Sequence, residues 1–394
     1  MPGVPEMTTA LQRCLPETAF AWIDQWPPLT ANESVELAAS PGRLLAHPVL
    51  GGLDEPPHPR TARDGFAVCA AETEGASDYN PLPLGLAREG RVGPGIAVAV
   101  RSGEPLPVGA DAVLPLELAD AAGKLLDVAG SVAPGEGVIQ PGEEYRAGEE
   151  LLAAGRWLRA QDIAWLALAG INRVTVRRRP RVRVVLTGEY PREVNGKLLG
   201  ALVGRDGGEL CGLDVVPTAQ MLETVLAWPA ADLVLVVGGS GLGDNDYAAR
   251  VLAEAGELVY HGVAIHPGDS AGLGRLGATP VVLLPGSPLA CLCAYDLLGS
   301  RLSRRLAGWQ RPWPYRGETL PLARKIASQL GRLDICRVRV VNGKAEPVAV
   351  SEGRLLRTVA RADGVVLVPV QSEGYAAGSE VTVYRFDDYS PCAP

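Results

Sequence analysis

The sequence predicts a multidomain protein that combines an α/β domain with β-rich domains. Its 394 residues exceed what one ordinary hydrophobic core accommodates, so we expect two to four domains. In the middle of the chain, branched apolar runs end in glycine- or proline-bearing loops and are followed by helical patterns, which is typical of a parallel sheet covered by helices. Elsewhere short strand-like runs alternate with turns, in keeping with 47 Gly and 33 Pro.

The first part of the chain divides into helical and β-rich stretches. Residues 8–46 are predicted to be helical, with Asn32 as the cap of the helix that ends near Gly42. Residues 47–138 contain β-prone runs such as Ile96–Val100 between Gly/Pro turns, which predicts a β-rich domain. Residues 140–176 return to a helical pattern that includes Ala160–Ala169 and is followed by a strand at Arg173–Val176.

Three buried strands are predicted in the α/β region, at Val182–Leu186, Leu233–Val237 and Val281–Leu284. Each is followed by a loop that carries glycine or proline. Because ligands of open α/β sheets bind at the carboxyl ends of strands, we expect the three loops to form one crevice. Pro288 suits the first position of the next helix, and the pattern after residue 309 is again strand-rich.

The most informative turn follows the second of these strands and contains Gly238, Gly239, Gly241 and Gly243. A Gly-rich turn between a buried strand and a helix exposes backbone N–H groups at the positive end of the helix dipole, which suits a phosphate or another oxyanion. The alternative interpretation is a tight turn capped by Asp244. The spacing matches neither the Gly-Lys-Ser/Thr phosphate loop nor the G-x-G-x-x-G dinucleotide fingerprint. The turn therefore predicts an anionic ligand without identifying it.

Composition argues against several classes of function. A net charge of −8 disfavours nucleic acid as the main partner. No apolar run approaches the length of a membrane span and no secretory pattern is present, so we expect a cytoplasmic protein with no membrane partner. The seven Cys are scattered without a C-x-x-C pair and the four His form no H-E-x-x-H motif, so a dedicated transition-metal site is not expected.

Six segments together resemble one known family. In chain order they are Arg63-Asp-Gly-Phe-Ala-Val68, the run Arg101–Val113 with its Leu-Pro-Val-Gly-Ala-Asp-Ala-Val end, Pro141-Gly-Glu-Glu144, Leu186-Thr-Gly-Glu-Tyr190, Gly238–Tyr247 and Leu283-Leu-Pro-Gly-Ser-Pro288. They resemble motifs of the molybdopterin molybdenumtransferase family, which includes MoeA and the gephyrin E domain. The resemblance covers nearly the whole chain.

The resemblance implies a homodimer of four-domain subunits. Residues 1–46 and 139–178 would form a discontinuous helical domain, on either side of a β-rich domain at 47–138. Residues 179–308 would form a three-layer α/β domain that binds molybdopterin, and residues 309–394 a small β-barrel.

The resemblance also implies a reaction in molybdenum cofactor biosynthesis. In the family, a transferase binds adenylylated molybdopterin, Mg²⁺ assists cleavage of the pyrophosphate link, and molybdate is inserted into the dithiolene with release of AMP. A client molybdoenzyme is a further partner that this role allows.

Particular residues match the family's motifs. Asp246 and Glu189 correspond to acidic residues expected to hold Mg²⁺, while Asp64 and Ser102 correspond to residues that the partner subunit brings to the cleft; these four are the expected catalytic set. The alternative roles are a helix cap for Asp246 and a turn-ordering contact for Asp64. The residues expected to contact molybdopterin lie in the three loops and are Thr187, Gly188, Gly238, Gly239, Ser240, Gly241, Gly243, Pro285, Gly286, Ser287 and Pro288.

The chain also departs from the family. Where the family has a loop with three lysines, Lys-x-Ala-x-Lys-Pro-Gly-Lys-Pro, this chain has Gly262, His266 and Asp269 at the lysine positions. Those lysines would offset the charge of molybdate and phosphate, and Arg205 is one arginine that could compensate. The segment 196–202 differs as well. The helix that should follow it contains Gly204, Asp206, Gly207 and Gly208, so we expect that helix to be shortened or broken.

Two hypotheses follow. One is a molybdate insertase with a divergent site. The other is a non-catalytic relative that binds molybdopterin or a partner molybdoenzyme as a scaffold or chaperone. The lost lysines favour the second, and the retained acidic residues and Gly-rich loops favour the first. The glycine spacing disfavours a dinucleotide-dependent enzyme.

Overall fold

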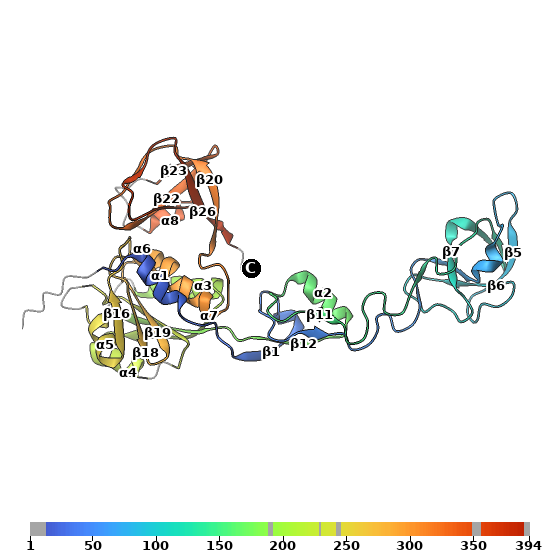
Figure 1. The fold of residues 1–394 in the computed structure, drawn as a ribbon, viewed down its shortest axis with the longest axis horizontal. Helices are drawn as coiled ribbons and strands as arrows, with labels where there is room; N and C mark the ends of the chain where they lie inside the picture. Colours follow the sequence, from blue (N-terminus) through green and yellow to red (C-terminus); the bar gives the residue numbers. More distant parts are fainter. Residues whose placement is uncertain (1–12, 188–191, 228–229, 242–245, 349–355, 390–394) are drawn as a thin grey trace, which may run out of the picture. The chain divides into compact units, whose positions relative to one another are not determined.

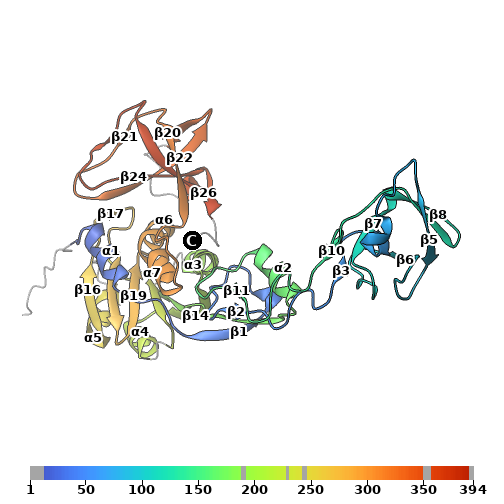
Figure 2. The same cartoon turned by 45° about the vertical axis from the view of Figure 1, so that its right-hand side comes forward.

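The computed structural model describes residues 13–187, 192–227, 230–241, 246–348 and 356–389. The chain forms two compact units: the first contains residues 1–34, 42–44 and 176–394, and the second contains residues 35–41 and 45–175. Figures 1 and 2 label their elements. No helix within these described ranges is long and apolar enough to cross a membrane.

The first unit is built on a six-stranded sheet. Its first four strands pair in parallel, and each of the last two strands pairs antiparallel with the strand before it. The strand order is β14 (Glu209–Val216), β13 (Arg181–Thr187), β15 (Leu233–Val237), β19 (Thr279–Leu284), β18 (Gly272–Leu276) and β16 (Glu257–His261). The three strands predicted from the sequence are thus adjacent in the middle of the sheet.

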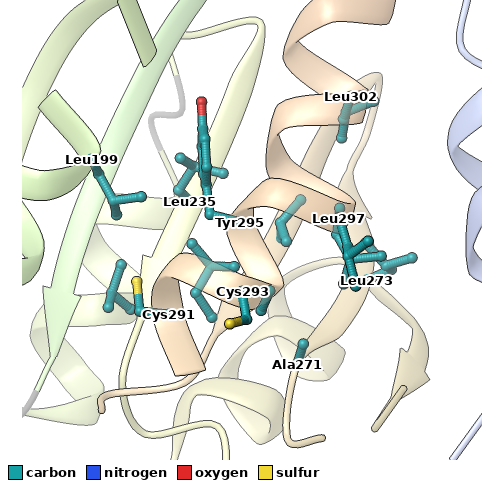
Figure 3. Close-up of a cluster of buried hydrophobic side chains, with 14 of the residues drawn as sticks. Leu199, Leu235, Ala271, Leu273, Cys291, Cys293, Tyr295, Leu297 and Leu302 are labelled. Carbon is teal, nitrogen blue, oxygen red and sulfur yellow. The ribbon is translucent and has the colours of Figure 1, made fainter. Parts of the chain in front are cut away.

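Helices cover both faces of this sheet, so β15 and its neighbours are buried on both sides. On one face, Leu233 and Leu235 join a core that contains Leu199 and Leu302 (Figure 3). On the other face, Val234, Val236 and Val281 pack against two further helices. The helices of the first face are α1 (Pro16–Asp24), α3 (Arg192–Arg205), α6 (Pro288–Ala294) and α7 (Ser300–Leu306), and those of the second are α4 (Ala219–Leu226) and α5 (Ala248–Ala255).

Pro288 begins α6, as the sequence predicts, and a π-helical turn at Tyr295–Gly299 joins α6 to α7. A Cβ at Gly299 would lie 2.7 Å from the ring of Tyr295. The wide turn therefore accommodates a fully buried aromatic side chain against the helix backbone (Figure 3).

The C-terminal part of the first unit forms a second sheet. Its order is β17 (Ile265–His266), β22 (Leu333–Val341), β24 (Gly364–Val368), β26 (Glu380–Tyr389) and β20 (Tyr315–Pro321), while β23 (Lys344–Pro347) pairs with β22 and β21 (Ile326–Ala327) pairs with β25 (Gly374–Tyr375). The short strand β17 lies between β16 and β18 in sequence, yet it pairs in parallel with β22. This pairing brings the start of β22 to the segment whose lysines are missing.

The second unit contains another six-stranded sheet together with α2 (Ala160–Leu168). The sheet order is β7 (Ala112–Pro115), β4 (Gly65–Val68), β6 (Ile96–Val100), β5 (Leu82–Ala87), β9 (Leu125–Val128) and β8 (Ala119–Ala122), and two small pairs are formed by β10 (Val138–Ile139) with β3 (Arg60–Thr61) and by β11 (Glu150–Leu152) with β2 (Val49–Leu50). The β-rich interpretation of this part of the chain is confirmed.

Two helix predictions are wrong. Asn32 does not cap a helix: it begins the strand β1 (Asn32–Glu36), whose exposure alternates, after Pro27 and Pro28 have removed two helix donors. Of residues 140–176, only Ala160–Leu168 is helical, and the predicted strand at Arg173–Val176 is found as β12 (Arg173–Arg177).

The helix expected after segment 196–202 does not continue through Asp206, Gly207 and Gly208. Segment 196–202 itself lies inside α3, which runs over 14 residues and ends at Arg205.

Glycine spacing explains why α3 persists. Gly196 and Gly200 lie four residues apart, so they share one helix face. A Cβ at Gly196 would lie 3.2 Å from Leu186 Cδ1, and one at Gly200 would lie 3.8 Å from Leu210 Cδ2. Gly196 therefore lets the helix pack closely on β13, whereas the distance at Gly200 is an ordinary contact. The packing of α3 on β13 and β14 outweighs the low helix propensity of both glycines. The helix ends before Gly207, which has φ of 77°.

Candidate functional site

The ends of β13, β15 and β19 meet at the carboxyl edge of the α/β sheet. The loop that follows β13 lies outside the described residues. Thr187 ends β13, and its Oγ1 donates a hydrogen bond to the carbonyl of Val237 at 3.0 Å. The N–H of Gly238, which follows β15, donates to the carbonyl of Leu284 at the end of β19 at 2.9 Å. A Cβ at Gly286 would lie 3.5 Å from Gly238 Cα, so the last loop lies directly beside the Gly-rich turn.

The Gly-rich turn has no room for side chains. Gly238 and Gly239 have φ of 88° and 60°, which disfavours other residues. A Cβ at Gly238 would lie 2.9 Å from Thr187 Oγ1. Ala248 at the start of α5 donates its N–H to the carbonyl of Gly239 at 2.9 Å. The turn thus presents bare backbone immediately before a helix, the arrangement suited to an anion.

Asp246 lies against this turn. A Cβ at Gly241 would be only 2.5 Å from Asp246 Oδ2, so glycine is required for the carboxylate to occupy its position. The N-cap of α5 is Tyr247, whose side chain makes no capping hydrogen bond. The predicted residues Gly188, Glu189 and Gly243, and the alternative cap Asp244, lie outside the described residues.

Ser240 connects the turn to the segment 262–270. It is 2% exposed, and its Oγ lies 3.3 Å from Ser270 Oγ. His261 Nε2 donates to the Ser240 carbonyl at 2.8 Å, which sets the tautomer of the ring. The segment that has lost its lysines therefore borders the Gly-rich turn.

Asn195 is a site residue that the sequence reasoning missed. It lies in the first turn of α3, is 1% exposed, and its Nδ2 donates to the Gly286 carbonyl at 2.8 Å. Its Oδ1 is buried and has no hydrogen-bond partner within the described ranges, which is uncommon for a buried polar atom. Ser287 is the N-cap of α6, so Asn195 links two helix starts. An asparagine at a helix start is too frequent in proteins to have indicated this contact.

The charges around segment 262–270 come from other elements. Burial lowers the pKa of the His266 imidazole; the positive charges of Arg332 and Arg337 lower the pKa further, and the carboxylates of Asp334 and Asp269 raise it. His266 is therefore neutral near pH 7 and does not replace a lysine. The arginines reach it because β17 pairs with β22, a contact that the sequence did not indicate.

Two further residues change the expected charge balance. Asp269 accepts a hydrogen bond from Arg13 at 2.6 Å, so its negative charge is paired. Arg205 does not serve as the compensating cation: its Nη2 lies 2.7 Å from carboxylate oxygens of both Asp206 and Asp296, in a buried network that includes Tyr315.

Asp64 and Ser102 lie together in the second unit. Ser102 donates its N–H to Asp64 Oδ1 at 2.8 Å and its hydroxyl to the Ala62 carbonyl at 3.2 Å. Both residues are exposed. Asp64 thus orders the turn that carries Ser102, which leaves its second carboxylate oxygen for other contacts.

Within the described ranges, no three His, Cys, Asp or Glu side chains cluster as a ready-made metal site. Mg²⁺ does not need such a cluster, because it usually keeps several waters and binds one or two carboxylates together with substrate phosphates. The position of Asp246 beside the Gly-rich turn fits that pattern.

Comparison with known proteins agrees along the whole chain. Residues 7–170 match the MoeA N-terminal region (domain I and II), residues 183–304 match a probable molybdopterin binding domain, and residues 319–386 match the MoeA C-terminal region (domain IV).

Individual relatives show the same likeness. A molybdopterin molybdenumtransferase of Nostoc is 31% identical over 309 residues, covering 72% of this chain and 71% of that protein. Molybdopterin molybdenumtransferase 2 of Mycobacterium tuberculosis is 29% identical over 394 residues, covering 89% and 94%. A crystal structure of the molybdopterin biosynthesis MoeA protein from Pyrococcus horikoshii has a TM-score of 0.73 at 28% identity, covering 95% of this chain and all of that one. The chain therefore belongs to the MoeA family of molybdenum cofactor biosynthesis proteins.

Proposed function

We propose that this chain is a molybdopterin molybdenumtransferase that inserts molybdate into adenylylated molybdopterin with release of AMP. The observation that carries the proposal is the convergence of Thr187, the Gly238–Gly241 turn and the Pro285–Pro288 loop at one edge of the sheet, in the segment that matches the molybdopterin-binding family. Its relatives named molybdopterin molybdenumtransferase support the same activity.

The chemistry of the proposed substrate matches the site. A pyrophosphate link carries negative charge on its phosphate oxygens. Backbone N–H groups at the start of a helix bind such oxygens well. The Gly238 N–H already donates to the Leu284 carbonyl, so the proposed phosphate donors follow Gly238 in the turn. The glycines leave no Cβ to keep the phosphates away. The loop Pro285–Pro288, held by Asn195, forms the neighbouring wall.

Mg²⁺ is the proposed resident cation. Asp246 would hold it, with Glu189 as the second proposed ligand, and the ion would neutralise phosphate charge while the pyrophosphate link is cleaved. The absence of a Cβ at Gly241 leaves room for the Asp246 carboxylate directly beside the Gly-rich turn.

A second copy of the chain is the proposed source of the remaining groups. By resemblance, Asp64 and Ser102 would reach the cleft of the partner in a cytoplasmic homodimer. Their mutual hydrogen bond holds the two together as one exposed unit, which suits a pair delivered to another surface. A client molybdoenzyme is the proposed recipient of the finished cofactor.

The deciding experiment is in vitro insertion. The purified protein is incubated with adenylylated molybdopterin, Mg²⁺ and micromolar molybdate, AMP is measured by chromatography, and an apo molybdoenzyme reports the cofactor formed. We expect molybdate- and Mg²⁺-dependent AMP release, and its near loss in Asp246→Asn. Tight binding of adenylylated molybdopterin without AMP release or reactivation would refute insertion and favour the scaffold hypothesis instead.

A further inference from the structure

The segment Gly262–Ser270 is poor in positive charge for a neighbour of an anion-binding turn. It contains no Lys or Arg, His266 is neutral near pH 7 for the reasons given above, and Asp269 is acidic. A tetrahedral oxyanion next to Ser240 and Ser270 would therefore meet no positive charge from the segment itself. Stabilisation of such an anion normally requires preorganised donors or cations.

The residues before α1 bring a cation to this segment. Cys14 pairs with it as a short parallel bridge: its N–H donates to the Gly262 carbonyl at 3.0 Å, and its carbonyl accepts from the Ala264 N–H at 2.9 Å. The adjacent Arg13 is thereby held over the segment, where its Nη2 lies 2.6 Å from Asp269 Oδ2. Backbone hydrogen bonds thus hold Cys14 and its neighbour Arg13 beside a segment that is distant in sequence.

A chain of contacts links Arg13 to the Gly-rich turn. Asp269 is the immediate neighbour of Ser270, and Ser270 Oγ lies 3.3 Å from Ser240 Oγ in that turn. The Arg13 and Asp269 side chains are 50% and 49% exposed. An exposed ion pair of this kind contributes little to the stability of the fold. The Arg13 guanidinium can therefore leave the Asp269 carboxylate and bind another anion at a small cost in free energy.

We propose that Arg13 is a positioning cation for a tetrahedral oxyanion at the Ser240–Ser270 edge of the site, with Asp269 as its counter-ion when the anion is absent. This inference rests on the proposed function, because it assumes that the site handles molybdate or phosphate. The anion arrives, the Arg13 guanidinium donates to it, and Asp269 returns to solvent. No covalent bond is formed or broken in this step.

The test compares two substitutions that break the same ion pair. Arg13→Gln removes the cation, so molybdate binding should weaken by about 5- to 10-fold, the size expected for losing one partly solvated charge next to an anion. Asp269→Asn removes the competing anion, so binding should tighten by about 2- to 5-fold. Equilibrium affinity for molybdate and, separately, for AMP is measured by calorimetry on the full-length protein with Mg²⁺ present.

A matched control lies in the same unit. Arg275 and Glu257 form an ion pair at 2.6 Å with 53% and 52% exposure, on β18 and β16, and no site contact involves them. Arg275→Gln and Glu257→Gln should leave both affinities unchanged. The double variant that exchanges the charges, Arg13→Asp with Asp269→Arg, should keep affinity within about twofold of the native protein, because a cation remains next to Ser270.

The outcomes separate the inference from the function on which it rests. Opposite effects of Arg13→Gln and Asp269→Asn support the inference, and the arm in which they appear identifies the anion as molybdate or the nucleotide phosphate. If the native protein binds and inserts molybdate but the two substitutions have equal effects, or no effect on either affinity, the inference about Arg13 is overturned and the proposed function stands. Failure of the native protein to bind either anion overturns both the inference and the proposed function.

Discussion

Gly241→Ala tests whether Asp246 serves the reaction or only the local fold. The added Cβ would lie 2.5 Å from Asp246 Oδ2 and 3.1 Å from Cγ, whereas nonbonded contacts prefer about 3.5–4.0 Å. The carboxylate must therefore retreat by about 1 Å. Because the obstructing atoms are at the tip of a side chain and Gly241 has no positive φ, we expect little change in the free energy of unfolding.

The effect on activity should be large. A misplacement of about 1 Å in a positioned group can cost about 100-fold in rate, so AMP release should fall by about that factor. Gly204→Ala is the matched control, since a Cβ there meets nothing within 4 Å; it should leave the rate unchanged and stabilise α3 by about 1 kcal/mol. A native rate in Gly241→Ala would refute a role for the Asp246 carboxylate in catalysis. A large drop in melting temperature would show that its contact is structural.

The other predictions concern loop support, pH and assembly. Asn195→Leu should destabilise the first unit by about 1–3 kcal/mol, because the Gly286 carbonyl loses its donor, and it should weaken AMP binding; unchanged urea unfolding and affinity would contradict the clamp. The pKa of His266 is lower in the folded protein than its usual 6.5, so below about pH 6.5 the unfolded chain binds the proton more readily and stability falls with decreasing pH. His266→Gln should reduce that fall in pH-dependent thermal unfolding, and an identical pH profile would rule out this linkage. Asp246→Ala should abolish the Mg²⁺ dependence of ligand binding, and a persistent dependence would assign the ion elsewhere. Light scattering at micromolar concentration should give twice the 41.3 kDa chain mass, and a species of that single mass would refute the homodimer.

Local patterns were sufficient for the centre of the α/β sheet. Leu233–Val237 is a strand with the predicted bounds, because a run of branched apolar residues is stable only when both sheet faces are covered. The meeting of the three strand ends also followed, since adjacent parallel strands end at the same edge. The predicted tight turn after β15 is also present, with positive φ at Gly238 and Gly239.

Tertiary packing supports a helix that local propensity disfavours. The glycines of α3 lower its intrinsic helicity, yet Gly196 permits close contact with β13. That benefit depends on a sheet formed by distant residues, so the sequence of the helix could not reveal it. Asn32 is the opposite case: it was predicted to cap a helix, but it begins the strand β1.

The sequence by itself determined the strand–turn–helix units and the family, because those depend on neighbouring residues and on motif order. The tertiary structure alone decided which charges surround the site. Asn195 meets Gly286, Arg13 meets Asp269, and Arg332 acts on His266 across separations of many tens of residues. Such contacts are created by strand order and by the β17–β22 pairing, and a Coulomb interaction depends on distance in space rather than along the chain.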